Sequence, residues 1–230
     1  MPEESDIEVV VLDVLGTMVD EPGGIRAAIR DAAPTADDAT VDQLLGVWQG
    51  HVEHEQRRIA EGARRFANTE IIDREAAGLV ADRAGPLDSM TVERLATAGQ
   101  RLAPWADSIA GLTRLARQFP VIGLSNASRA ALLRLNRYAG LRWHQALSAE
   151  DVAAYKPAPE VYRLAAHAAG CPPERILMVA AHAWDLRGAQ AVGLRTAYVQ
   201  RPVGDPPTGK DAFDGQFDSL NALVAALRTA

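Results

Sequence analysis

The sequence predicts an α/β protein, a doubly wound and mainly parallel sheet with an inserted all-helical cap domain. Over residues 100–230, short apolar runs rich in β-branched residues alternate with helical patterns, as in a sheet covered by helices on both faces. Residues 21–99 show helical periodicity and no convincing strand. We therefore expect residues 1–20 and 100–230 to form the core and residues 21–99 to form the cap.

The predicted strands are short apolar runs. Ile7–Leu12 is almost uninterrupted and ends at Asp13, which is typical of a parallel strand buried on both faces. Further strands are expected at Val121–Leu124, Ala146–Ser148, Ile176–Ala180 and Thr196–Val199, of which the run at Ala146 is the weakest.

The predicted helices have apolar residues at helical spacing. In the core they cover Asp107–Gln118, Ser128–Tyr138 and Ala158–Ala169. In the insertion a helical repeat runs from Val41 to Val52, and further stretches follow at Gln56–Arg65, Asn68–Arg83 and Ser89–Gly99. Pro22-Gly23-Gly24 and Ala103-Pro104 are the expected hinges, and Arg201–Lys210 is a loop-rich stretch.

Composition and charge limit the partners and the cellular location to expect. The 230 residues carry 24 Lys and Arg against 30 Asp and Glu, a formal net charge of −6, which argues against nucleic acid or an anionic membrane as a partner. The one cysteine, Cys171, cannot form an internal disulfide, and we interpret it as structural. The N-terminus lacks a signal-peptide pattern, so we expect a cytoplasmic protein.

Polar side chains follow several of the predicted strands. Asp13 ends the first strand, Ser125 and Asn126 end the second, Lys156 follows the weak third strand, and Asp185 lies just past the fourth. Ligands of open parallel sheets bind at the carboxyl ends of the strands. The sequence therefore predicts that these groups converge on one crevice.

Asp13 is the candidate nucleophile. A carboxylate at a strand end can attack carbon or phosphorus when a cation steadies it. Gly16 permits a sharp turn beside it, and the Thr17 hydroxyl can orient it. The alternative is an aspartate that only caps the following turn.

Lys156 is the candidate cation. It lies close to a helix start within Lys156-Pro157-Ala158-Pro159, where an amine is disfavoured by the helix dipole, so an anionic partner such as Asp13 is expected. The alternative is an exposed loop lysine. Tyr162 is either an aromatic residue at the core edge or a hydroxyl donor to the site.

The remaining candidates surround the same crevice. Ser125 and Asn126, with the helix that follows, offer donors for a small anion, although simple helix capping explains them equally well. His182, Trp184 and Asp185 follow the fourth strand, and each also has a structural interpretation as a packed or capping residue.

Taken in order, these motifs resemble the haloacid dehalogenase (HAD) superfamily of hydrolases, and most closely its type II 2-haloacid dehalogenase branch. The resemblance covers nearly the whole chain. It is carried by the Asp13 loop, the helical cap, Ser125-Asn126, Lys156 with its prolines and Tyr162, and the Trp184-Asp185 loop. It implies a HAD-like core and a small halogenated carboxylic acid as substrate.

The resemblance also implies roles for individual residues. Asp13 would attack the halogen-bearing carbon and form an ester that water cleaves, Lys156 would steady the carboxylates, and Asp185 would position or activate the water. Ser125 and Asn126 would hold the substrate carboxylate and the halide, with Thr17 and Tyr162 in support. No cofactor or metal is implied, and the apolar cap helices are compatible with a homodimer.

The chain departs from the branch at three places. Leu15 replaces an aromatic residue, Gln49 replaces an arginine that follows a cap tryptophan, and Ala180-Ala181-His182 replaces a serine- and asparagine-rich motif. Gln49 and His182 are accordingly expected to form a weaker halide site. The alternatives are a magnesium-dependent phosphatase of the superfamily, whose acids Leu15 and Ala181 replace, and a binding protein with little turnover.

Overall fold

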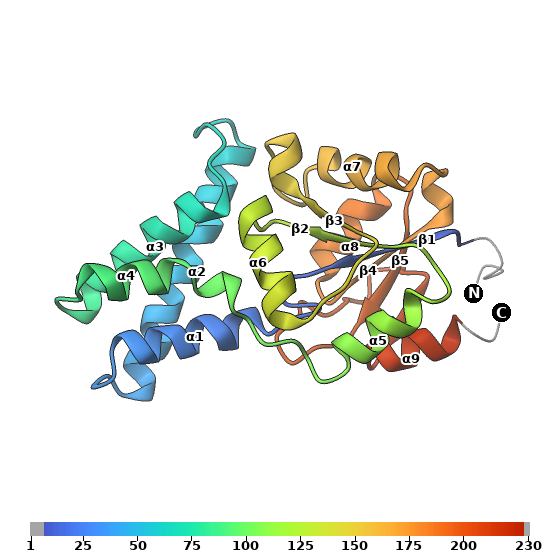
Figure 1. Cartoon of the computed structure of the whole chain (residues 1–230). Coiled ribbons are helices and arrows are strands. Elements are labelled where there is room, and N and C mark those ends of the chain that lie inside the picture. Colours follow the sequence, from blue (N-terminus) through green and yellow to red (C-terminus); the bar gives the residue numbers. More distant parts are fainter. Residues whose placement is uncertain (1–6, 228–230) are drawn as a thin grey trace.

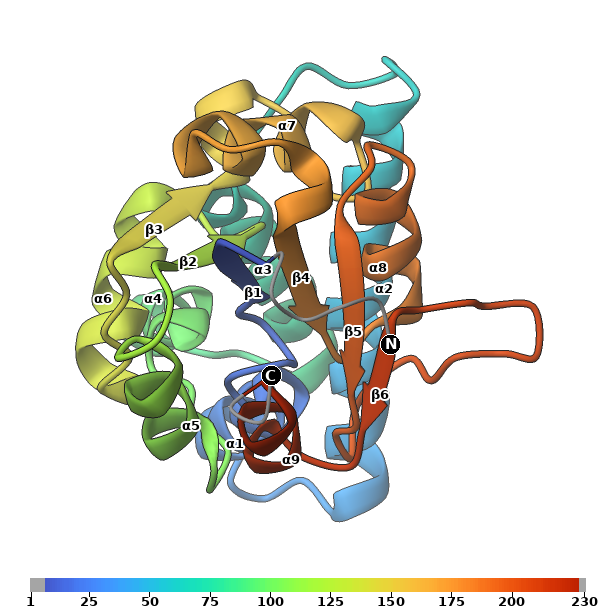
Figure 2. The ribbon, with the colours of Figure 1, turned by 90° about the vertical axis from the view of Figure 1, so that its right-hand side faces the viewer.

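A six-stranded parallel sheet forms the centre of the molecule. The computed structural model describes residues 7–227, and its strands lie in the order β3-β2-β1-β4-β5-β6 (Figure 2). All neighbouring pairs are parallel, and Asp13 at the end of β1 is in register with Leu124 of β2. The strands are β1 Val9–Asp13, β2 Val121–Ser125, β3 Gln145–Ser148, β4 Ile176–Ala180, β5 Arg195–Val199 and β6 Gly215–Phe217.

Helices cover both faces of this sheet. Val9 and Val11 of β1 pack toward α7 and α8, whereas Val10 and Leu12 pack into the cluster that holds α5, α6 and α9. This alternation explains why the β1 sequence is apolar at every position. The core helices are α5 Ser108–Leu115, α6 Arg129–Ala139, α7 Pro159–Ala169, α8 Ala183–Gln190 and α9 Leu220–Ala226, with short 3-10 helices η3 Ala149–Val152 and η4 Pro173–Arg175.

The other helices form the cap beside the sheet (Figure 1). They are α1 Glu21–Ala32, α2 Asp38–Ala60, α3 Thr69–Ala84 and α4 Ser89–Ala96, followed by the 3-10 helix η2 Ala98–Gln100. The insertion of an all-helical cap into an α/β core is therefore confirmed. The boundaries at residues 21 and 99 remain a prediction.

Several element predictions need correction. The stretch Gln56–Arg65 is not a separate helix, because α2 continues without a break to Ala60. Pro22-Gly23-Gly24, the expected hinge, lies in the first turn of α1, where Asp20 caps the helix by accepting a hydrogen bond from the Gly23 amide at 3.0 Å. Proline in the first turn lacks only an N–H that would have no helical partner. Strand β6 and helix α9 were not predicted.

The carboxyl ends of the strands face the cap (Figure 1), and residues of the loops after β1, β2 and β4 line one cavity together with residues of α1 and α2. Between residues 7 and 227, no helix combines the length and the apolar character needed to cross a bilayer.

Candidate active site

Asp13 lies at the carboxyl end of β1, and its side chain is almost fully buried. Its Oδ2 accepts a hydrogen bond of 2.7 Å from the Thr17 hydroxyl, whose oxygen in turn accepts one of 2.9 Å from the Ala181 amide. Gly16 makes the turn between Asp13 and Thr17 with φ +77°, and a Cβ there would lie 2.4 Å from Nε2 of His182. Glycine is therefore needed for both conformation and space. The turn fixes the Asp13 carboxylate from one side.

Lys156 holds the same carboxylate from the other side. Its Nζ donates a hydrogen bond of 2.8 Å to Asp13 Oδ1 and another of 2.8 Å to Asp185 Oδ2. The lysine side chain is 1% exposed. Its backbone amide donates to Asn126 Oδ1 at 2.9 Å, so Asn126 positions the loop that carries the lysine.

Pairing with Asp13 and Asp185 keeps the Lys156 side chain ionised. Burial alone would lower the pKa of Lys156, but the charges of Asp13 and Asp185 outweigh burial and raise its pKa above the ordinary value. Burial raises the pKa of Asp185, and the positive charge of Lys156 opposes that rise. One ammonium therefore serves two carboxylates, and the lysine is already engaged before any substrate binds.

Asp185 is enclosed within the protein. Both of its carboxylate oxygens are occupied, since Oδ2 accepts from Lys156 and Oδ1 accepts a 2.6 Å hydrogen bond from the Tyr162 hydroxyl. Both Asp185 and Tyr162 are fully buried. Burial and the Asp185 charge raise the pKa of Tyr162 above its usual range, so the hydroxyl keeps its proton and acts as a donor.

A cavity of about 380 Å³ opens over Asp13 and Lys156. Its walls come from the loops after β1, β2, β3 and β4, from α1 and α2 of the cap, and from the loop before β6. The lining residues are Asp13, Leu15, Glu21, Pro22, Ile25, Leu45, Trp48, Gln49, Val52, Glu53, Gln56, Asn126, Lys156, His182, Trp184, Val203, Gly204 and Asp205.

The structure brings most of the predicted site residues to this cavity. Leu15, Gln49, Asn126, His182 and Trp184 line it together with Asp13 and Lys156. Thr17 and Asp185 do not line it but hold Asp13 and Lys156 by hydrogen bonds.

Two predicted substrate contacts lie behind the cavity wall. Ser125 is fully buried, and its Oγ accepts a hydrogen bond of 3.1 Å from the Ala127 amide. Tyr162 is directed at Asp185 rather than at the cavity. In this structure neither side chain reaches the space where a substrate would lie, so both are placed as supporting residues.

The sequence interpretation missed three acidic groups at the cavity, which are Glu21, Glu53 and Asp205. Glu21 lies in the first turn of α1, directly before the segment interpreted as a hinge. Asp205 lies in the loop-rich stretch, where its Oδ2 accepts a hydrogen bond of 3.1 Å from the Trp184 amide. The acidic pair Asp20-Glu21, so close after Asp13, was the available signal for the first.

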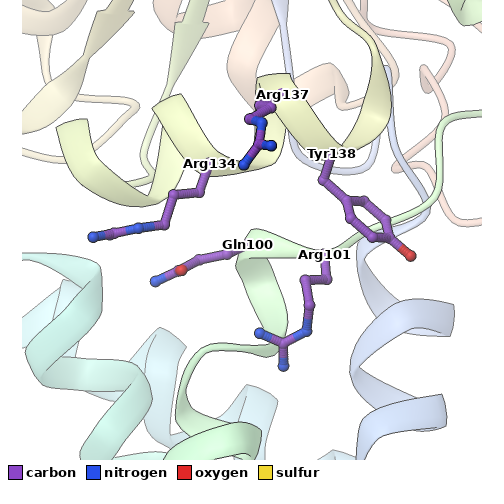
Figure 3. A pocket seen from close by; sticks show the side chains of 5 residues that line it. All are labelled: Gln100, Arg101, Arg134, Arg137 and Tyr138. Carbon is purple, nitrogen blue, oxygen red and sulfur yellow. The ribbon is translucent and has the colours of Figure 1, made fainter.

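A second cavity, of about 530 Å³, lies between α6 and η2 (Figure 3). Arg134, Arg137 and Tyr138 project into it from α6, opposite Gln100 and Arg101 (Figure 3). It is larger than the first cavity, but no carboxylate, thiol or imidazole lines it. The cavity over Asp13 is therefore the candidate active site.

Comparisons with known proteins agree with this assignment. A family model described as a haloacid dehalogenase-like hydrolase matches residues 7–193. An (S)-2-haloacid dehalogenase of Pseudomonas putida is 30% identical, over 94% of this chain and 90% of the relative.

Solved structures similar to this chain are also haloacid dehalogenases. The crystal structure of a defluorinating L-2-haloacid dehalogenase has a TM-score of 0.87 at 31% identity, covering 96% of this chain and 95% of the other. The L-2-haloacid dehalogenase from Xanthobacter autotrophicus with chloropropionic acid covalently bound has a TM-score of 0.80 at 25% identity, covering 96% and 98%.

Proposed function

The chain belongs to the haloacid dehalogenase-like hydrolases, and we propose that it hydrolyses the carbon–halogen bond of small (S)-2-haloacids through an ester of Asp13. The observation that carries the proposal is the Asp13 carboxylate, held by Thr17 and Lys156 at the floor of a cap-covered cavity. The (S) configuration follows the name of the similar Pseudomonas putida protein.

In the first step an Asp13 oxygen attacks the halogen-bearing carbon, the new C–O bond forms, and the halide leaves with the electrons of the C–X bond. Lys156 holds the Asp13 carboxylate by an ion pair, and Thr17 fixes the direction of attack. In the second step water adds to the Asp13 carboxyl carbon, which restores Asp13 and releases a 2-hydroxy acid.

The remaining cavity residues suit the binding of a small organic anion. Leu15, Trp48 and Trp184 supply apolar and aromatic walls that exclude water, which strengthens the polar contacts inside. Gln49, Asn126 and His182 supply N–H groups for the substrate carboxylate and the departing halide. A cytoplasmic location, which the single cysteine favours, and a homodimer remain part of the proposal.

A substrate panel tests the function directly. We expect the purified protein to release halide from (S)-2-chloropropionate and to release little phosphate from an aryl phosphate, with both rates unchanged by a chelator. The physical reason is that Lys156 supplies the fixed positive charge at Asp13. Ion chromatography for halide and a colorimetric assay for phosphate measure the two products.

Phosphate release that depends on magnesium would support the phosphatase alternative. Magnesium requires several oxygen ligands, but Leu15 and Ala181 offer no side-chain oxygen where the phosphatase acids are expected. Within residues 7–227, no cluster of at least three His, Cys, Asp or Glu side chains could hold a metal. Chelator-sensitive phosphate release that magnesium restores would overturn the dehalogenase proposal, and no turnover on any substrate would favour a binding protein.

Gln49 offers a second test. Replacing Gln49 with arginine adds a cation to a cavity whose lysine is already paired, so we expect the KM for 2-chloropropionate to fall about fivefold, as for an exposed charge pair worth about 1 kcal/mol. Steady-state kinetics measure the effect. Gln118→Arg on the core surface adds the same charge away from the cavity and should change nothing. An unchanged KM in Gln49→Arg would place residue 49 outside the substrate's reach.

A further inference from the structure

The enclosed position of Asp185 leaves the second half-reaction without an obvious base. The Asp13 ester needs a water molecule that loses a proton as it attacks. Asp185 is fully buried, its two oxygens already accept hydrogen bonds from Lys156 and Tyr162, and it does not line the cavity. Asp185 is therefore better suited to hold Lys156 than to meet a water molecule.

Glu21 is a carboxyl group that does face this space. It lines the cavity at the first turn of α1, and the charge of Asp13 acts on it. Asp20 caps the same turn and thereby fixes the helix start. Within residues 7–227 the Glu21 side chain has no hydrogen-bond or ion-pair partner, so its oxygens are free to bind water.

We propose that Glu21 is the general base of ester hydrolysis, an inference that rests on the proposed dehalogenase function. The Glu21 carboxylate takes a proton from water as the water oxygen bonds to the Asp13 carboxyl carbon. The tetrahedral intermediate collapses, the bond to the alkyl oxygen breaks, and that oxygen takes the proton back from Glu21. The 2-hydroxy acid leaves, and the acid proton on Asp13 passes to solvent.

The electrostatics of the cavity favour proton transfer from water to Glu21 after the Asp13 ester has formed. Burial and the negative charge of Asp13 raise the pKa of Glu21 to about 7 in the free enzyme. Esterification makes Asp13 neutral and so removes one of these two causes. The pKa of Glu21 then falls, which favours its carboxylate form at the step that needs a base. Other titratable groups around Glu21 are Asp73 of α3, Glu53 of α2, Lys156, His182 and Asp205.

His182 is the competing base, since its ring also lines the cavity. Its Nε2 lies against the backbone of Gly16, so close that a Cβ on Gly16 would be 2.4 Å away. The opposite neighbour is Trp184, with ring centroids 5.6 Å apart. The ring is therefore packed between the Asp13 loop and an indole.

Rapid-mixing experiments with (S)-2-chloropropionate separate the two half-reactions. In Glu21→Gln we expect a halide burst equal to the enzyme concentration, followed by steady-state turnover about 10²-fold slower than wild type. Mass spectrometry of the quenched variant should find the acyl group on the peptide that contains Asp13. The rate of ester hydrolysis should rise with pH through one ionisation in wild type and be flat in the variant.

Matched variants complete the test. Glu160→Gln changes another glutamate in the first turn of a helix, and it should behave as wild type. Glu21→Asp keeps a shorter carboxylate and should hydrolyse the ester at an intermediate rate.

Three outcomes would overturn the inference. These are normal turnover in Glu21→Gln, absence of a halide burst in that variant while wild type turns over, and accumulation of the ester in His182→Asn but not in Glu21→Gln. Absence of halide release in wild type would instead refute the proposed function on which the inference rests.

Discussion

Replacing Asp13 by asparagine is expected to reduce halide release from 2-haloacids by about 10⁴-fold or more, the scale seen when a covalent nucleophile is removed. The amide has nearly the shape of the carboxylate, its oxygen can still accept a hydrogen bond from Lys156, and its NH2 group can donate to the Thr17 hydroxyl oxygen, so the fold should persist. What the variant loses is the negative oxygen that attacks carbon. Halide assays on the variant, with circular dichroism as the check on folding, measure the two effects.

Isotope labelling tests the same role without a mutation. In a single turnover of wild type in heavy-oxygen water, the label should appear in Asp13 and not in the 2-hydroxy acid, because water attacks the Asp13 carbon. Asp31→Asn, an exposed aspartate of α1, removes an equal charge and should leave the rate unchanged. Label in the product of the first turnover would mean that water attacks the substrate directly, and Asp13 would not be the nucleophile.

Most of the core was predictable because its strands bury both faces. Every position of β1 is buried, so the sequence there is uninterrupted and easily recognised. Strand β6 was missed because Gly215–Phe217 lies at the sheet edge, where burial does not impose an apolar run. The first turn of α1 was missed because Pro22-Gly23-Gly24 opposes helix formation locally, and only the Asp20 cap and packing against Leu102 and the rest of the cap make it helical.

The positions of site residues were predictable where those residues lie at the carboxyl ends of strands. Asp13 ends β1, Asn126 follows β2 and Lys156 follows β3, so a parallel sheet brings them together whatever the details of the loops. The directions of side chains were not predictable. Ser125 and Asn126 are neighbours, yet one is buried behind the wall and the other lines the cavity. Asp205 reaches the cavity through tertiary packing that no local spacing encodes.

Replacing Lys156 by methionine is expected to have the largest effect on stability. The change leaves Asp13 and Asp185 buried without their cation, and breaking a buried ion pair in this way costs about 3–5 kcal/mol of the free energy of unfolding at pH 7. Urea unfolding measures the loss. Lys210→Met, which removes an exposed lysine, should lie within about 0.5 kcal/mol of wild type.

The pH dependence of this loss identifies its cause. The pKa of Lys156 is raised in the folded protein, so its stabilising effect is complete below the ordinary lysine pKa and is lost only as the pH rises through the raised value. At pH 7 and pH 5 wild type therefore has the full contribution. Lys156 lowers the pKa of Asp185 against the effect of burial, so without Lys156 the pKa of Asp185 rises further in the folded state, which then binds a proton more tightly than the unfolded chain. The stability of Lys156→Met should consequently rise toward that of wild type between pH 7 and pH 5, whereas a deficit equal at both pH values would assign the loss to packing of the lysine stem and not to the two carboxylates.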